Sequence, residues 1–173
     1  MICVLPLSPL DKAAIDQLHS IYTRCQRADL YEDPKYARNL NVFIDDEGDF
    51  SWIVENVLQK YGIDAEDLDN FYKEQRCNGI NFNVLTSNDW VHDHKDYNPA
   101  KLNILVTPDT ACNIFFVDDH ESWYYHTPAI LDVSKKHRVE NLWKLTEPRV
   151  MLQAFLNKPF SHYRRMIEQR NAR

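Results

Sequence analysis

The stretch WVHDHKDYNPAKLNILV, residues 90–106, decides the fold, because a group of titratable side chains stands here at the start of a predicted β-strand. Positions 92–96 hold two histidines and two aspartates, and apolar residues then alternate with polar ones up to Val106. Side chains two positions apart on a strand point to the same face, so we expect His94 and Asp96 to project together, with Lys95 turned away. An imidazole and a carboxylate on one face provide two ligands for a metal ion.

Short apolar segments with a period of two residues fill the chain from Asn78 onward and predict strands separated by turns. Apolar residues alternate with asparagines in NFNV, residues 81–84, and recur in the stretch quoted above. Further segments are NIFFV (113–117), SWYYH (122–126), AILDV (129–133), HRVEN (137–141) and RVMLQAFL (149–156). So many short strands indicate a sandwich, jelly roll or barrel.

The first half of the chain has helical periodicity instead. One helix follows Ser8 or Asp11 as its cap, and a second one, over residues 49–62, is capped by Asp49 or Ser51 and ends at Gly62. Each of these helices has an apolar stripe, which in the first helix consists of Ile15, Leu18, Tyr22 and Cys25. A third helix is predicted over residues 64–75 and a C-terminal helix after Pro159. We therefore expect one α+β domain over residues 1–173, with 1–77 a mainly helical support, 78–157 the β-core with the metal site and 158–173 the C-terminal helix.

Composition narrows the class of protein. The 173 residues carry a net charge of −6, which argues against nucleic acid as a partner, because phosphate binding usually needs a basic surplus. The four cysteines have no CxxC spacing, so free thiols in a cytoplasmic protein are expected. No apolar run approaches the roughly 20 residues that span a bilayer, and the opening MICVLPLSPL lacks the basic start of a signal peptide, so no membrane is expected as a partner.

A third metal ligand must come from elsewhere in the β-rich half, because a His-x-Asp pair is common by chance. His137 opens one of the late predicted strands, and Arg149 opens the apolar strand that follows it. An arginine that faces a β-core is costly unless an anion pairs with it, and its planar guanidinium binds a carboxylate through two hydrogen bonds. These residues predict a metal ion and an anion-binding arginine in one site.

The order His94-x-Asp96, His137, Arg149 resembles that of the Fe(II)- and 2-oxoglutarate-dependent oxygenases, in particular the branch similar to aspartyl/asparaginyl hydroxylases. The resemblance covers about residues 80–156 and rests on HKDYNPAKLNILV (94–106) and PAILDVSKKHRVENLWKLTEPRVMLQAF (128–155). Leu131-Asp132 and His137-x-Val-x-Asn141 are similar to motifs of that branch. The helical first 75 residues match no family in this way.

The resemblance implies a double-stranded β-helix, a jelly roll of the cupin type, buttressed here by the N-terminal helices. It implies Fe(II) bound by His94, Asp96 and His137, with 2-oxoglutarate as cosubstrate and its distal carboxylate held by Arg149. Such enzymes use O₂ to decarboxylate 2-oxoglutarate and hydroxylate a substrate. The substrate is left open between a free amino acid, a peptide side chain and a small metabolite, and the oligomeric state is left open as well.

Several assignments remain alternatives at this point. His92, His94 and His137 with Asn141 would form the ligand set of a cupin-like metal-binding or ligand-binding protein without 2-oxoglutarate chemistry. Asn141 could instead lie behind a metal ligand and hydrogen-bond near it. Lys101 or Asn103, on the strand after the His-x-Asp pair, could reach the cosubstrate. Aromatic residues favour substrate pockets, and the candidates for lining one are Trp90, Tyr97 and Trp123, together with Tyr124 and Tyr125.

Overall fold

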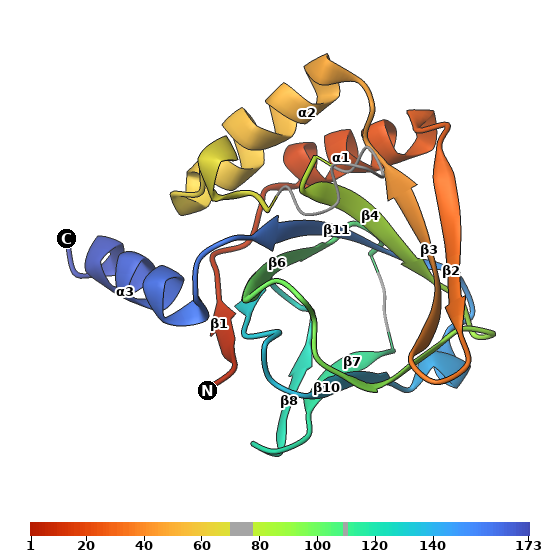
Figure 1. Cartoon of the computed structure of the whole chain (residues 1–173). Coiled ribbons are helices and arrows are strands. Elements are labelled where there is room, and N and C mark those ends of the chain that lie inside the picture. Colours follow the sequence, from red (N-terminus) through yellow and green to blue (C-terminus); the bar gives the residue numbers. More distant parts are fainter. Residues whose placement is uncertain (70–77, 109–110) are drawn as a thin grey trace.

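A single antiparallel sheet curls into a nearly closed barrel in the computed structural model of the chain (Figure 1). The structure describes residues 1–69, 78–108 and 111–173. Within these residues the sheet has 11 strands. They are β1 (Val4–Pro6), β2 (Ala28–Asp33), β3 (Ala37–Phe43), β4 (Ile80–Leu85), β5 (Trp90–His94), β6 (Ala100–Leu105), β7 (Asn113–Phe116), β8 (Glu121–Tyr124), β9 (Ala129–Leu131), β10 (His137–Glu140) and β11 (Arg149–Leu156).

The chain alternates between two halves of this sheet. The strand order is β1-β9-β6-β11-β4-β3-β5-β10-β7-β8, so β4, β6, β9 and β11 are neighbours in one half and β5, β7, β8 and β10 in the other. β3 joins the halves, because its residues Leu40–Phe43 pair with β4 and its residues Ala37 and Arg38 pair with β5. β2 lies outside this order and pairs with β3.

Alternation along β11 shows why these sequences form a two-faced sheet. Its even-numbered residues belong to the main hydrophobic core together with residues of both N-terminal helices. Its odd-numbered residues face the barrel interior, where Arg149 and Gln153 line a cavity. The strand thus has one apolar face and one mixed face. The even-numbered set is Val150, Leu152, Ala154 and Leu156.

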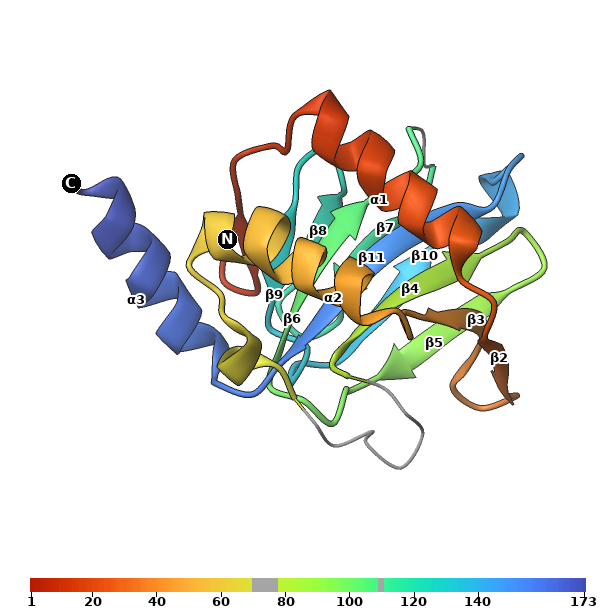
Figure 2. The same ribbon diagram turned by 90° about the horizontal axis from the view of Figure 1, so that it is seen from above.

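Two helices cover the outer face of the half-sheet that contains β4 and β11 (Figures 1 and 2). α1 (Lys12–Arg24) begins after Asp11, whose carboxylate accepts a hydrogen bond from the backbone N–H of Ala14. α2 (Glu47–Ile53) begins after Asp46, and not after Asp49 or Ser51 as expected. It continues as a π-helical turn, η1 (Val54–Leu58), and a 3-10 turn, η2 (Gln59–Tyr61), which ends at Gly62 with a positive φ of 77°.

The remaining helices are shorter or lie apart from the barrel. A 3-10 turn, η3 (Ala65–Asp67), occupies the start of the predicted third helix, and the part of that prediction beyond residue 69 lies outside the described residues. η5 (Leu142–Lys144) follows β10, and α3 (Phe160–Asn171) follows Pro159 as expected. Among the described residues, no helix combines the length and the apolar character needed to cross a membrane.

The expectation of a mainly helical support over residues 1–77 is wrong for residues 28–43, which form the β2–β3 hairpin. Asp33-Pro34 turns the chain, with the N–H of Tyr36 donating to the carbonyl of Asp33. β3 repeats the asparagine alternation of β4, but β2 is exposed along nearly its whole length. A strand that buries so little has no apolar periodicity to reveal it in the sequence.

A carboxylate ties the two ends of the curled sheet to each other. β1 and β8 end the strand order on opposite sides, and Glu121, the first residue of β8, lies beside the start of β1. Its Oε2 accepts hydrogen bonds from the backbone N–H groups of Ile2 and Cys3, at 3.0 Å and 2.9 Å. These bonds satisfy backbone donors that an edge strand would otherwise expose.

Candidate metal centre

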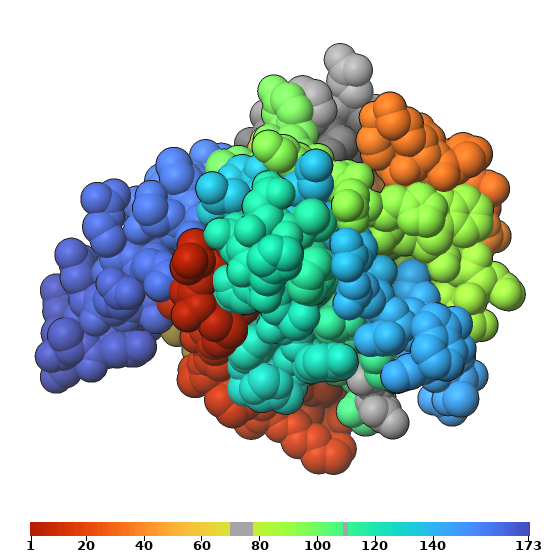
Figure 3. All heavy atoms as spheres, turned by 90° about the horizontal axis from the view of Figure 1, so that it is seen from below, coloured from red at the N-terminus to blue at the C-terminus, as the bar shows by residue number. Residues whose placement is uncertain are grey.

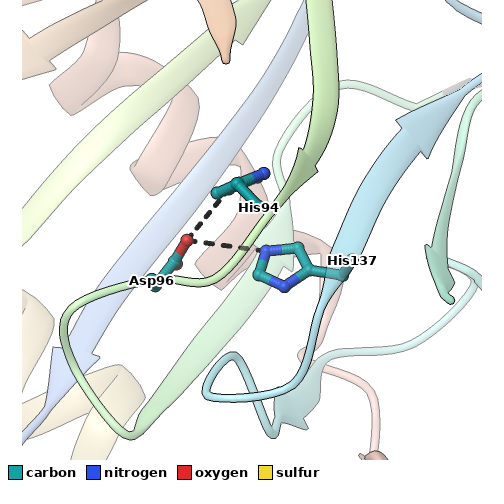
Figure 4. A group of neighbouring side chains, drawn as sticks. All are labelled: His94, Asp96 and His137. Carbon is teal, nitrogen blue, oxygen red and sulfur yellow. Dashed lines mark ion pairs between the residues drawn. The ribbon is translucent and has the colours of Figure 1, made fainter. Parts of the chain in front are cut away.

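His94, Asp96 and His137 lie together at one end of the barrel interior (Figure 4). His94 ends β5, His137 begins β10, and the antiparallel register places the two residues directly opposite each other. Asp96 Oδ1 lies 3.0 Å from His94 Nε2 and 3.5 Å from His137 Nε2. One ligand atom from each residue falls within 4.8 Å of the other two, so the three side chains could hold a metal ion.

Backbone carbonyls fix the orientation of both imidazoles. His94 Nδ1 is 2.8 Å from the carbonyl oxygen of His92, and His137 Nδ1 is 2.8 Å from that of Lys135. A carbonyl can only accept, so each Nδ1 carries a hydrogen and each Nε2 is turned to the cluster. This arrangement is typical of metal-binding histidines, whose second nitrogen donates to a carbonyl or carboxylate.

Asp96 is held ionised by its neighbours. Its side chain is 11% exposed, and Oδ2 contacts the ammonium group of Lys101. Burial alone raises the pKa of Asp96, but the charge of Lys101 and hydrogen bonds from both histidines outweigh burial and hold the pKa well below the usual 3.8. Burial by itself lowers the pKa of His94, but the hydrogen bond to Asp96 and the negative charge of Asp96 raise the pKa above the usual 6.5. The centre therefore offers an anionic carboxylate, as a divalent cation requires.

A cavity of about 90 Å³ extends from these residues into the barrel. Polar side chains from six strands line it, and apolar ones, among them Ile114, Leu131 and Val139, complete its wall. Such a volume accommodates several water molecules or a small organic ligand. The polar residues that line it are Asn39, Asn83, His94, Lys101, Asn103, Tyr125, His137, Arg149 and Gln153.

Arg149, the first residue of β11, lines the same cavity. It is 2% exposed, and its guanidinium donates to Asn83 Oδ1 at 3.1 Å and contacts Cys112 Sγ at 3.6 Å. Its Nε has no hydrogen-bond partner, and no carboxylate of the described residues lies within 4.0 Å. A buried cation without an anion is costly, so the residue is prepared for an anionic ligand.

Tyr125 provides a second donor near Arg149. Its ring centroid lies 5.9 Å from the Arg149 guanidinium carbon, and the residue is 4% exposed. Asn103 Nδ2 donates to the Tyr125 hydroxyl at 3.0 Å, which leaves the hydroxyl hydrogen free to donate elsewhere. Burial raises the pKa of Tyr125 to about 12, so the phenol keeps that hydrogen at neutral pH. Arg149 and Tyr125 thus present donors to one cavity.

Other expected residues have different positions. His92 is exposed, stacks on Trp90 with centroids 6.5 Å apart, and does not join the cluster, so the alternative set of three histidines is not formed. Lys101 contacts Asp96 and thus lies beside the metal ligands. Asn141, with φ of 64°, precedes η5 and donates to Asn113 Oδ1, so it shapes a turn and not the surroundings of a ligand.

Of the aromatic residues expected in a substrate pocket, Tyr125 lines this cavity, whereas Trp90, Tyr97, Trp123 and Tyr124 do not. Trp90 packs with its Nε1 3.5 Å from the carbonyl oxygen of Asp33, and Tyr97 is 70% exposed. Trp123 faces the same side as its strand partner Ile114 and packs in the apolar cluster that contains Ile114 and Leu131, beside the cavity but not in its lining. Exposure takes Tyr97 away from the interior, and packing in the barrel wall takes Trp123 out of the cavity lining.

Of the amide residues that line the cavity, the sequence predicts only Asn103 as a site residue. Asn83 Oδ1 accepts a hydrogen bond from Arg149, Asn39 Oδ1 accepts from the amide of Asn83, and Gln153 lines the wall. A signal was present: NLNVF (39–43) and NFNVL (81–85) both alternate asparagine with apolar residues. Two such strands predict a sheet with one amide face.

Comparison with known proteins adds no assignment. No protein-family model matches the chain, and no curated protein matches it with significance.

Proposed function

We propose that this protein is an Fe(II)- and 2-oxoglutarate-dependent dioxygenase that hydroxylates its substrate. The observation that carries the proposal is the presence of Arg149, a buried guanidinium without a carboxylate partner among the described residues, in the same cavity as His94, Asp96 and His137. A metal ion and an anion-binding donor in one small cavity suit a short dicarboxylate that contacts both.

The path of the chain supports the fold that such enzymes use. From β4 to β11 the chain crosses between the two half-sheets at each connection except the β7–β8 hairpin. Eight antiparallel strands that alternate in this way between two half-sheets are compatible with a jelly roll, which supports the proposal of a double-stranded β-helix. Of the proposed metal ligands, His94 ends β5, Asp96 follows it and His137 begins β10, and Arg149 begins β11.

The donor set fits Fe(II). Two imidazoles and one carboxylate on one side of a metal ion leave the other coordination positions open, which is the arrangement found in non-haem iron oxygenases. The bound iron would supply the chemistry of the reaction, in which O₂ is consumed, 2-oxoglutarate becomes succinate and CO₂, and a substrate C–H bond is hydroxylated.

The residues of the chain have separate roles in this proposal. His94 and His137 bind through Nε2, since their Nδ1 atoms are engaged by carbonyls. Arg149 binds the distal carboxylate of 2-oxoglutarate, and Tyr125 donates to the same group. Asn103 positions Tyr125 through its amide. The apolar part of the wall excludes water, which strengthens these charge-assisted bonds.

An anaerobic titration tests the proposal. Fe(II) is added to the metal-free protein, followed by 2-oxoglutarate, and the visible charge-transfer absorption of the iron chelate is recorded. We expect a band that requires both additions and that is absent from the His137→Ala variant. Succinate formation after admission of O₂ provides the second reading.

Iron binding without the band would contradict the proposal and would favour a cupin-like metal-binding protein that lacks 2-oxoglutarate chemistry. A protein that folds but binds no iron would contradict both functions. If the band appears, the substrate is sought among amino acids, peptides and small metabolites by their stimulation of succinate formation.

A further inference from the structure

β2 is the most exposed strand of the sheet. Its sequence is ADLYED, and five of its six side chains are exposed, including Leu30 at 52% and Tyr31 at 46%. It pairs with β3 and with no other strand of the described residues. In Figure 3 the atoms of this hairpin, in orange, lie at the periphery of the molecule. Ordering a residue costs about 1–2 kcal/mol, and β2 gains little burial of its own in return.

The backbone groups on the outer edge of β2 can be identified. In an antiparallel pair, every second residue is hydrogen-bonded to its partner strand and the residues between point away. The N–H of Phe43 donates to the carbonyl of Arg27, and the N–H of Tyr36 donates to that of Asp33, so odd-numbered residues face β3. The N–H and C=O groups of Ala28, Leu30 and Glu32 therefore point outward.

This edge differs from the others in the barrel. β1 and β8 have only three and four residues, and Glu121 binds the N–H groups at the start of β1. β2 is longer, pairs with β3 in unbroken register from Ala28 to Asp33, and contains neither a bulge nor a proline. Long regular edges are usually blocked by such devices, because they pair readily with another strand.

We propose that the outer edge of β2 pairs with β2 of a second copy of this chain, antiparallel and with Leu30 on the two-fold axis. In this register Ala28 faces Glu32 of the second copy, and all outward backbone groups between them are matched. Leu30 meets its own equivalent, which covers the most exposed apolar side chain of the strand. Asp29 faces Tyr31, so no carboxylate lies opposite a carboxylate.

Neighbouring registers are excluded by charge. Centring the pair on Asp29 places this aspartate opposite its own equivalent, and centring it on Tyr31 places Asp29 opposite Asp33. Like charges directly opposite each other destabilise a strand pair. The sequence of β2 is thus self-complementary in one register, which favours a second copy over an unrelated peptide and makes the contact isologous.

Sedimentation velocity over a series of protein concentrations tests the interface. We expect a monomer–dimer equilibrium whose dissociation constant increases at least about tenfold in Leu30→Lys, because two ammonium groups then meet at the axis. Tyr31→Lys is the matched control, since the new cation faces Asp29 and should leave the affinity unchanged or increase it. Both side chains are exposed, so neither change disturbs the core.

Cysteine cross-linking tests the register itself. Hydrogen-bonded partners have Cα atoms about 5.5 Å apart, within the range of a disulfide, so Leu30→Cys should form a symmetric disulfide on mild oxidation. In Tyr31→Cys the two sulfur-bearing residues are offset by two positions, roughly 8 Å apart, and should not cross-link. The parent protein, oxidised in parallel, controls for its own cysteines.

The proposal is overturned if the protein sediments as a monomer at every concentration that stays soluble, or if Leu30→Lys leaves a dimer intact. It is equally overturned if Tyr31→Cys cross-links and Leu30→Cys does not, or if an unrelated peptide and not a second copy protects the backbone N–H of Leu30 from hydrogen exchange. None of these readings depends on iron or 2-oxoglutarate, so they stand apart from the proposed enzymatic function.

Discussion

His137 lies directly opposite His94 on neighbouring antiparallel strands, and their ring centroids are 4.4 Å apart. The Nδ1 atom of each ring meets the carbonyl oxygen of the residue two positions earlier, at the same distance of 2.8 Å. The pair therefore presents two Nε2 atoms to Asp96 from a rigid sheet, and the backbone, not a flexible side chain, sets their direction.

The two histidines of β5 should differ in their effect on iron binding. His94→Ala removes a ligand and should abolish tight binding of Fe(II), because the remaining imidazole and carboxylate leave the site incomplete. His92→Ala should retain most of the affinity, since the His92 ring is exposed and only its carbonyl contacts the site. Anaerobic competition with a chelator measures both constants. The reverse order of effects would favour a ligand set that includes His92.

Arg149→Lys should weaken 2-oxoglutarate binding at least about tenfold and leave iron affinity nearly unchanged. A lysine keeps the charge but loses the two-pronged geometry, and charge-assisted hydrogen bonds contribute on the order of 1.5–3 kcal/mol. Arg138→Lys is the control, because Arg138 is paired with Asp93 and Glu140 near the surface. Equal 2-oxoglutarate constants in the parent and in Arg149→Lys would remove Arg149 from the cosubstrate site.

Tyr125→Phe should raise the dissociation constant for 2-oxoglutarate by a factor of roughly 2 to 10. The change removes one hydroxyl donor, worth about 0.5–1.5 kcal/mol, and leaves the amide of Asn103 without its partner. Tyr124→Phe, at a neighbouring but 50% exposed tyrosine, should have no effect. Calorimetric titration of the iron-loaded protein compares the variants, and identical constants in all three proteins would show that Tyr125 only packs.

Iron affinity should increase with pH above about 6.5. The pKa of His94 is raised in the metal-free protein, so this imidazole keeps its proton at a pH where an ordinary histidine has lost it. The bound proton stabilises the folded protein at a pH below the pKa that His94 has in the unfolded chain. This stabilisation is lost as the pH rises through the pKa that His94 has in the folded protein.

Iron must displace the same proton, so its affinity should increase by up to about tenfold per pH unit until His94 is neutral. Calorimetry in buffers of different ionisation enthalpy counts the protons released. A constant affinity across this range, with no release of protons, would show that His94 binds as a neutral group or not at all.

Glu121→Ala should lower the free energy of unfolding by about 1–3 kcal/mol. The substitution leaves the N–H groups of Ile2 and Cys3 without their acceptor and releases β1 from β8. Glu168→Ala, on the exposed side of α3, should change stability by less than about 0.5 kcal/mol. Urea unfolding followed by circular dichroism measures the difference. Equal stabilities would show that the contact between the ends of the sheet is unimportant.

The cluster of His94, Asp96 and His137 could be predicted only in part. His94 ends β5 and Asp96 lies beyond it, so the expected shared face of one strand is not what brings these two side chains together. The place of His137 and Arg149 at strand starts is readable along the chain. The tie between Glu121 and the start of β1 is not, since 118 positions separate Glu121 from Cys3 and only the curl of the sheet brings them together.

The hairpin and the amide layer were missed for different physical reasons. β2 buries too little to produce an apolar pattern, so the sequence does not distinguish its residues from the helical segments on either side. The asparagines of β3 and β4 are polar residues on the inward face of the sheet. A search for inward faces that counts only apolar residues overlooks them. The sequence predicts Lys101 at the cosubstrate, but nothing along the chain shows that the ammonium group of Lys101 contacts Asp96.

A crystal structure with Mn(II), as a redox-stable substitute for Fe(II), and 2-oxoglutarate tests the central claim most directly. The account predicts one metal ion about 2.0–2.3 Å from His94 Nε2, an Asp96 oxygen and His137 Nε2, with the distal carboxylate of 2-oxoglutarate at Arg149. A metal ion bound elsewhere, or a cavity that admits the metal ion but leaves Arg149 without the dicarboxylate, would contradict it.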